Sequence, residues 1–201
     1  MNLRSLQGLA GPHYIGLLAL ALLAFGNTVG AQPLKHPNPS EQALRGAALE
    51  GQIELVRASL DQGASPDAVD PDGRTALMMA AFNGHTETVR LLMDRGAKTN
   101  VLDGVGRTAL MYAAAGPYAH TVQFLIDRGA DLDIRDTEEG FTALMFAAAE
   151  GQAEVVEVLL SHGANIKITD KDGDTALDFA EKNGHQEAAK ILRTDFSLRS
   201  K

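Results

Sequence analysis

Between about residues 41 and 195, hydrophobic and polar positions recur along the chain in blocks of similar design. Each block has a short apolar stretch, a polar break, a second apolar stretch, and a link rich in Asp and Gly. In the first stretch of one block, Leu77, Ala80 and Ala81 stand at i, i+3 and i+4, which gives an α-helix one narrow apolar face. The pattern therefore predicts pairs of short helices, joined by turns and repeated along the chain.

One heptapeptide sets the register of the blocks. It occurs as TALMMAA at 75–81, TALMYAA at 108–114 and TALMFAA at 142–148, and its first three letters return at 175–177. Successive copies therefore start 33, 34 and 33 residues apart. We expect the Thr of each copy to cap a helix, because its hydroxyl can accept a free backbone N–H. The second stretch of the blocks ends in Gly-Ala, at Gly96, Gly129 and Gly163, where the positive φ that often follows a helix suits glycine.

An earlier, degenerate copy begins near Glu41, so we predict five units. They span about 41–72, 73–105, 106–139, 140–172 and 173–201. Arg45 and Gly46 in the first unit and Asp178 in the last occupy methionine positions of the other units. Polar residues are expected there because a terminal repeat has a neighbour on one side only. Two departures in the third unit, the break at 116–118 and one extra residue in the link at 136–140, are not explained in this way.

These submotifs resemble the ankyrin-repeat family, whose first helix carries Thr-Pro-Leu-His-x-Ala-Ala, followed by Gly-His and later by Leu-Leu-x-x-Gly-Ala. Here Ala replaces Pro, as at Ala76, and Met replaces His, as at Met78. The resemblance covers about residues 41–195. It implies an all-α repeat solenoid of L-shaped units with β-turn fingers along one side. It also implies a concave surface, made of finger tips and first helices, that binds other proteins.

The N-terminal thirty-one residues differ from the rest. Arg4 is their one charged side chain, an apolar run follows at 14–25, and small residues stand before Gln32. This order predicts a signal peptide over 1–31, cleaved after Ala31, and hence a periplasmic protein. An uncleaved signal anchor or a buried N-terminal helix is the alternative, although the run is shorter than a membrane span requires. Residues 32–40 read as a proline-rich linker that ends at Ser40, a candidate N-cap.

Net charge and cysteine content limit the class of partner and the cellular compartment that we expect. The chain has a formal charge of −8 and contains no cysteine. Nucleic-acid binding depends on Lys and Arg that neutralise phosphates, so we expect no nucleic-acid partner. The absence of cysteine agrees with export to an oxidising compartment. We expect a monomer that binds a protein and does not insert into a membrane after signal cleavage.

The methionine, histidine and aspartate residues that could bind a metal or react with oxidants each have a simpler structural role as the alternative. The methionines at 78, 111 and 145 could ligate Cu(I) or consume oxidant. Stacking would keep them about one helix spacing apart, roughly 8–10 Å, so we favour a packing role. His85 and His185 are expected to form local hydrogen bonds, since no metal-binding spacing is present. The Asp-rich links faintly resemble calcium loops, but turn formation is favoured. We predict no catalytic residue, cofactor or metal site.

The candidate binding residues lie in the fingers and first helices. The resemblance implies that variable positions there contact the partner, namely Val69, Arg74, Phe82, Leu102, Val105, Arg107, Arg135 and Phe141. Aromatic residues and Arg are enriched among binding hot spots, so we expect an apolar and arginine-rich patch across the second to fourth units. Packing of Phe141 and Leu102 against neighbouring fingers is the alternative. Tyr118 is a weaker candidate.

Three functions remain open from the sequence. The first is a non-catalytic interaction module in the cell envelope. The second is protection against oxidants through methionine. The third is inhibition of, or immunity against, a toxin or an envelope enzyme, for which no residue pattern speaks directly.

Overall fold

The computed structural model describes residues 39–199. The predicted signal peptide and residues 32–38 of the predicted linker lie outside the described residues. The helices within this range are α2 (Pro39–Leu49), α3 (Ile53–Asp61), α4 (Ala76–Phe82), α5 (Thr86–Asp94), α6 (Ala109–Ala114), α7 (Ala119–Asp127), α8 (Ala143–Ala149), α9 (Ala153–Ser161), α10 (Ala176–Lys182) and α11 (Gln186–Arg199). No strand occurs between residues 39 and 199.

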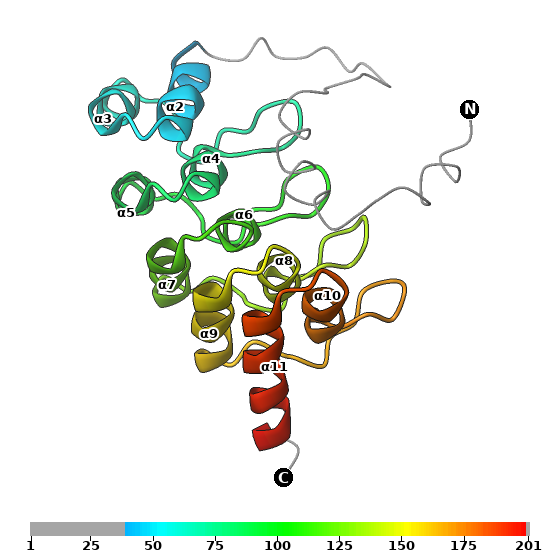
Figure 1. Cartoon of the computed structure of the whole chain (residues 1–201). Helices are drawn as coiled ribbons and strands as arrows, with labels where there is room; N and C mark the ends of the chain where they lie inside the picture. Colours follow the sequence, from blue (N-terminus) through cyan, green and yellow to red (C-terminus); the bar gives the residue numbers. More distant parts are fainter. Residues whose placement is uncertain (1–38, 200–201) are drawn as a thin grey trace.

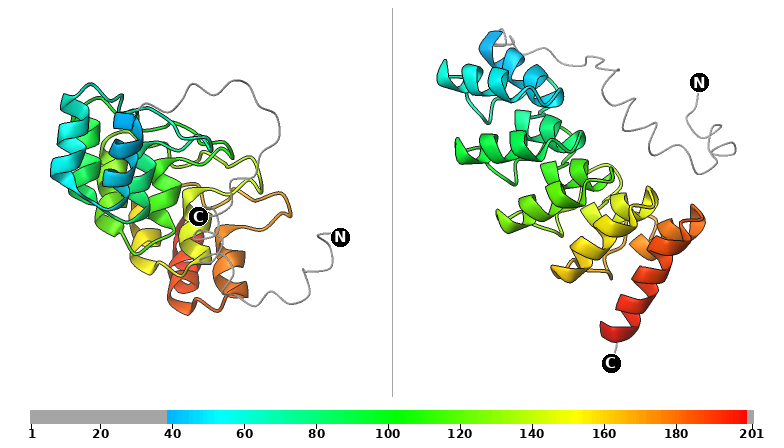
Figure 2. Two further views of the ribbon diagram at one scale, coloured as in Figure 1. Left: turned by 90° about the horizontal axis from the view of Figure 1, so that it is seen from above. Right: turned by 60° about the vertical axis from the view of Figure 1, so that its left-hand side comes forward.

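The helices form two layers that run along a stack (Figures 1 and 2). The first helices of the units, α2, α4, α6, α8 and α10, pack against one another in sequence order. The second helices, α3, α5, α7, α9 and α11, do the same in the outer layer. The links between units project as loops on the side of the first helices (Figure 1). The prediction of an all-α repeat solenoid is confirmed, and residues 39–199 form five helix pairs.

The repeated threonines cap the first helices as predicted. In α4, α6, α8 and α10 the Thr hydroxyl accepts the backbone N–H three residues later, at 3.3, 3.3, 3.4 and 3.3 Å. The glycines that close the second helices also have the expected positive φ, which is 92° at Gly96 and 83° at Gly129. Both ends of the helix pair are thus encoded locally, by one hydroxyl and one residue without a Cβ.

The methionine in the fourth place of the heptapeptide belongs to the core. Met78, Met111 and Met145 have exposed fractions of 1%, 2% and 1%. The Sδ of Met78 also accepts the backbone N–H of Thr75 at 3.4 Å. The prediction that these side chains pack in the scaffold is confirmed, because each lies inside the continuous apolar core.

The first unit departs from expectation in two ways. Helix α2 begins at Pro39, so Ser40 lies inside the helix and is not the N-cap that we expected. Proline suits a first helical turn, since an N–H there has no helical partner. Arg45 is also buried rather than turned to solvent, and its Nη1 donates to the carbonyl of Ala68 at 3.4 Å.

In the last unit Asp178 completes the cap of α10. Its carboxylate accepts the backbone N–H of Thr175 at 2.8 Å and the Thr175 hydroxyl at 2.5 Å. These bonds hold the pKa of Asp178 below its usual value. An acidic residue in place of the buried methionine therefore stabilises the helix start at the end of the stack.

The breaks between paired helices connect each unit to the preceding one. Nε2 of His85 lies 3.0 Å from the carbonyl oxygen of Leu49, and the Asn83 amide donates to the same oxygen at 2.7 Å. His185 repeats this contact with the carbonyl of Ala149 at 2.9 Å. Both histidines form hydrogen bonds as predicted, but the bonds are not local: they satisfy the C-terminal end of a helix in the preceding unit.

The third unit uses an aromatic ring at this place. Tyr118 lies so close to Gly84 and Gly116 that a Cβ on either glycine would come within 2.1 and 2.3 Å of the ring. Thr121 provides the hydrogen bond to the preceding unit instead, donating from its hydroxyl to the Gly84 carbonyl at 3.2 Å. The irregular break at 116–118 is therefore accommodated by packing against glycine.

Candidate protein-binding face

Four loops form the finger side of the stack. We name them finger 1 (residues 69–74), finger 2 (102–107), finger 3 (135–141) and finger 4 (169–174). The second residue of each finger is an aspartate, namely Asp70, Asp103, Asp136 and Asp170. In finger 2, for example, Oδ1 of Asp103 accepts the backbone N–H groups of Val105 and Arg107 at 2.9 and 2.8 Å. The predicted turn-forming role of these aspartates is confirmed.

The extra residue of finger 3 is absorbed by the same aspartate. Oδ1 of Asp136 accepts three backbone N–H groups, from Glu139, Gly140 and Phe141, at 3.0, 2.8 and 3.1 Å. The backbone N–H of Asp136 donates to the carbonyl of Phe141, five residues later, whereas that of Asp103 donates to Arg107, four residues later. The insertion thus lengthens the finger tip and leaves the base of the finger in register.

Neighbouring fingers are joined by backbone hydrogen bonds. Gly104 N–H donates to the Asp72 carbonyl at 2.7 Å, and Thr137 N–H donates to the Val105 carbonyl at 2.9 Å. Lys171 N–H continues the series to the Glu139 carbonyl at 2.9 Å. The four fingers therefore form one connected ladder. At the equivalent place in finger 1 stands proline, residue 71, which has no N–H to extend the ladder.

The arginines of fingers 1 and 2 are paired within the protein. Arg74 contacts the carboxylates of Asp70 and Asp72, each at 2.8 Å. Arg107 is 8% exposed and contacts Asp136 at 3.4 Å and Glu138 at 3.1 Å. Since Arg107 belongs to finger 2 and its partners to finger 3, this ion pair holds the two fingers together.

The remaining predicted residues divide into packed and exposed side chains. Phe141 packs edge-on against Phe146 and Phe179, with ring centroids 5.5 and 4.8 Å apart. Arg135 is exposed, but its guanidinium donates to the carbonyls of Gly140 and Thr169 at 3.1 and 2.8 Å.

On fingers 1 and 2, Val69 and Leu102 are each 50% exposed, and Val105 is partly buried. Arg107 and Phe141 both contact Phe146, whereas Arg135 connects fingers 3 and 4 through backbone carbonyls. Leu102 stands free on the surface.

Phe82 lies on the first-helix side, beside Tyr112. The two rings meet edge-on, with centroids 6.1 Å apart. The Tyr112 hydroxyl donates to Oδ2 of Asp103 at 2.7 Å, which anchors finger 2 to α6. Burial raises the pKa of Tyr112 above its usual range, and the hydrogen bond to Asp103 adds to the rise.

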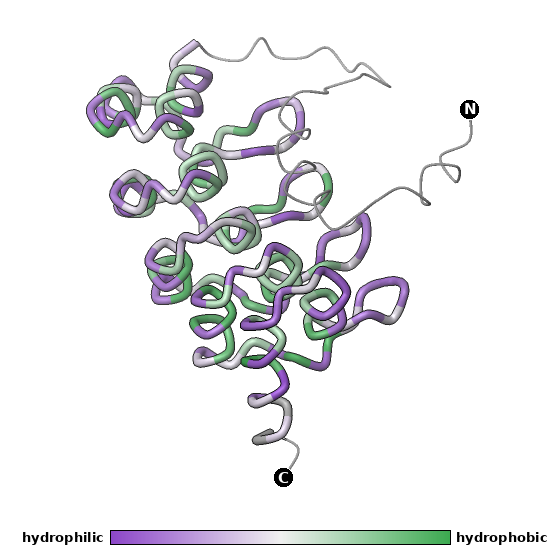
Figure 3. Tube along the Cα trace, in the orientation of Figure 1, coloured by the Kyte–Doolittle hydropathy of each residue, from purple (hydrophilic) through white to green (hydrophobic). Residues whose placement is uncertain are grey.

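Sequence reasoning missed a set of residues on the same face. They occupy the fifth place of the repeated motif in the third to fifth units, namely Tyr112, Phe146 and Phe179, which contact Asp103 or Phe141 of the fingers; in the second unit this place holds the buried Met79. This is the one place at which the three heptapeptides differ, and that variation was a usable signal. The helices α4, α6 and α8 contain no charged residue, whereas the finger loops are largely hydrophilic (Figure 3). The face thus has an apolar floor and polar fingers.

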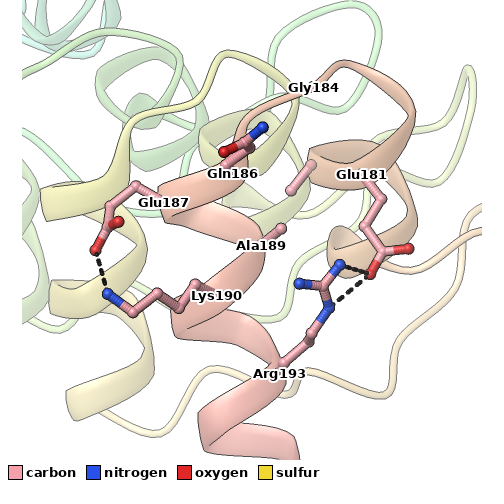
Figure 4. A pocket seen from close by; sticks show the side chains of 8 residues that line it. Glu181, Gly184, Gln186, Glu187, Ala189, Lys190 and Arg193 are labelled. Atoms are coloured by element: carbon pink, nitrogen blue, oxygen red, sulfur yellow. Dashed lines mark hydrogen bonds and ion pairs between the residues drawn. The ribbon is translucent and has the colours of Figure 1, made fainter.

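A pocket of about 550 Å³ lies between α10 and α11, away from the predicted residues (Figure 4). Its charged side chains pair with one another, with Arg193 and Glu181 2.8 Å apart and Lys190 and Glu187 3.4 Å apart. This arrangement fits the polar end of a stack.

Between residues 39 and 199, no three His, Cys, Asp or Glu side chains are placed to hold a metal ion. In the same range, no helix has the length and apolar character needed to span a membrane.

The repeat geometry defines an interaction scaffold of stacked helix pairs with fingers. The family model described as ankyrin repeats (3 copies) matches residues 44–136 and 116–200. The chain therefore belongs to the ankyrin-repeat family, whose repeats are protein–protein interaction modules and typically non-catalytic. No curated protein matches the sequence.

Proposed function

We propose that this protein is a non-catalytic binding module of the cell envelope, which holds a protein partner on the face formed by its fingers and first helices. It acts as a monomer, without nucleic acid or cofactor, and reaches the periplasm through the signal peptide at residues 1–31. The predicted contacts on this face, Arg74, Phe82, Leu102, Val105, Arg107, Arg135 and Phe141, are part of the proposal.

One observation carries the binding face: an exposed apolar side chain on a rigid support. Leu102 is 50% exposed, although finger 2 is bonded to fingers 1 and 3 through its backbone at Gly104 and Val105. The Tyr112 hydroxyl adds a third anchor through Asp103. Removing an exposed leucine from water contributes favourably to the free energy of binding. A rigid loop also reduces the entropy lost on binding.

A matched pair of variants tests the face. Leu102→Ser removes the exposed finger leucine, and Leu55→Ser removes a leucine on the outer helix α3 that is 56% exposed. Each full-length protein is immobilised, and proteins captured from envelope extract are quantified. We expect Leu102→Ser to lower recovery of the partner and Leu55→Ser to leave it unchanged. Equal recovery with both variants would count against the face.

The paired arginines act mainly as supports in this proposal. Replacing Arg107 would remove the ion-pair partner of the buried Asp136 carboxylate, which would keep only its backbone N–H donors, and loss of a buried ion-pair partner destabilises a fold directly. Loss of binding in an Arg107 variant would therefore report on finger structure as well as on contact. Leu102 avoids this ambiguity because its side chain is half exposed.

Export is supported by the order of charged, apolar and small residues at 1–31. The test is the N-terminal sequence of the protein recovered from fractionated cells. A mature N-terminus at Gln32 in the periplasmic fraction is expected. A chain that begins at Met1 in the cytosol would contradict the location and leave the binding face untouched.

The oxidant-protection alternative has less support. Repeated sulfoxide cycling needs methionines that oxidants and reductases can reach. Met78, Met111 and Met145 are at most 2% exposed. Inhibition of a toxin or an envelope enzyme is a narrower form of the proposed binding function, and its test is the identity of the captured partner.

A further inference from the structure

We propose that the partner presents a basic polypeptide segment with apolar side chains, which lies across the four fingers. The apolar side chains contact fingers 1 and 2, and the Lys or Arg side chains face fingers 3 and 4. This inference rests on the proposed binding function and specifies the chemistry of the partner.

The apolar contacts are set by two equivalent positions. Val69 and Leu102 each precede the aspartate of their finger, and each is 50% exposed. The two fingers are joined by the hydrogen bond from Gly104 N–H to the Asp72 carbonyl. The two side chains are therefore about one repeat apart, roughly 8–10 Å. They offer two apolar contacts in a row along the stack.

The basic character of the partner is inferred from the acidic residues of the fingers. Fingers 1 to 4 contain nine carboxylates and four basic side chains. In finger 3, Glu138 and Glu139 stand together at the exposed tip, and in finger 4 Asp172 is exposed. Backbone pairing between Lys171 and Glu139 holds these two tips next to each other. Negative charge is therefore concentrated at the end of the finger row that follows the apolar pair.

All four basic side chains of the fingers bond within the protein. Arg74 and Arg107 pair with carboxylates, while Arg135 and Lys171 donate to backbone carbonyls. The fingers therefore present an excess of negative charge to a partner, and each of their four basic side chains is already bonded within the protein. Complementary charge steers association and excludes wrong partners, so an acidic segment or a nucleic acid is disfavoured.

The floor of the face agrees with this chemistry. The helices α4, α6 and α8 carry no charged side chain that could offset the charge of the fingers; in α10, Lys182 pairs with Asp174 of finger 4 and leaves Glu139 and Asp172 to face the partner. Tyr112 and Phe179 are partly exposed there. Aromatic faces accept Lys and Arg side chains through cation–π contacts, in addition to apolar groups.

The test uses random peptides displayed on phage as the probe and the immobilised full-length chain as the target. Selected peptides are sequenced, and the tightest is titrated against wild type and three variants. Glu139→Gln with Asp172→Asn neutralises two exposed finger carboxylates, neither of which forms a side-chain ion pair with any residue between 39 and 199. Glu154→Gln with Glu157→Gln makes the same charge change on the outer helix α9. Leu102→Ser removes the apolar contact.

We expect the selected peptides to be rich in Lys or Arg beside apolar residues. Affinity should fall about tenfold in the finger carboxylate variant and on raising the salt concentration, with no change in the α9 variant. Peptides without basic enrichment, or equal affinity for the two carboxylate variants, would overturn the inference. If Leu102→Ser still weakens binding in that case, the proposed function survives. If neither finger variant weakens it, the proposed function fails as well.

Discussion

At the scale of single residues, neighbouring positions of the heptapeptide have different structural roles. Its Thr caps the helix, its Met fills the core, and in α6 and α8 its fifth residue contacts a finger side chain. Tyr112 shows the last role, since its hydroxyl lies 2.7 Å from the Asp103 carboxylate. The sequence predicts the first two roles because they depend on local bonding and periodicity. The third depends on a finger that precedes the helix, and periodicity alone does not reveal it.

The Tyr112 phenol should ionise late. Burial raises its pKa, and the Asp103 carboxylate adds to this, so the folded protein retains the proton above the ordinary tyrosine pKa of about 10. The resulting stability is fully present below pH 10 and is lost as the pH rises towards the folded pKa. We expect alkaline titration at 295 nm to show one late phenol that disappears in Tyr112→Phe. A late phenol that persists in the variant would contradict the assignment.

The buried methionines should resist mild peroxide. Met78, Met111 and Met145 are at most 2% exposed, while Met93 is partly exposed on α5. Peptide mapping of the folded protein should therefore show sulfoxide at Met93 first, and similar rates at all four residues after unfolding. Rapid oxidation of the buried three in the folded state would revive the oxidant-protection alternative.

At the scale of elements, the finger is the unit whose structure the sequence predicts only in part. The Asp and Gly content predicts a turn, and the turn is present. The pairing between fingers depends on a close approach of backbones from different units. Gly73 illustrates it, because a Cβ there would lie 2.7 Å from the backbone nitrogen of Gly104. A single finger sequence contains no sign of that neighbour.

Substitutions at two equivalent glycines distinguish the stability that comes from contact between fingers from the stability of the turn itself. Gly73 and Gly173 both have positive φ, 80° and 90°, but an added Cβ at Gly173 meets nothing within 4 Å. Gly173→Ala should cost about 1–2 kcal/mol of unfolding free energy from backbone strain alone. Gly73→Ala should cost about 1–3 kcal/mol more from the clash. Urea denaturation measures both, and equal costs would show that the finger ladder contributes little.

At the scale of the whole molecule, stability arises from contacts between neighbouring units, because each helix pair packs mainly against the pair before it and the pair after it. The number of units, their period and the stacked architecture follow from the sequence. The irregular third unit does not, because its ring at Tyr118 fits only where Gly84 and Gly116 both lack a Cβ. The residues predicted to bind a partner lie in the fingers, apart from Phe82 in α4, yet their ion pairs and aromatic clusters could be recognised only from the three-dimensional arrangement.

A one-dimensional stack should respond differently to the same cavity at its centre and at its end. Leu125 in α7 and Leu192 in α11 occupy the same place in their units, and both are 0% exposed. Replacement of either by Ala should cost about 2–5 kcal/mol. In Leu125→Ala the loss falls on a unit with two neighbours, so the whole urea transition should move to lower denaturant concentration. In Leu192→Ala the last unit should open separately, with hydrogen exchange accelerated in α10 and α11 while α4 to α8 keep their protection. A single, equally shifted transition in both variants would mean that the five units unfold as one body, and the terminal unit could not then act as an independent cap.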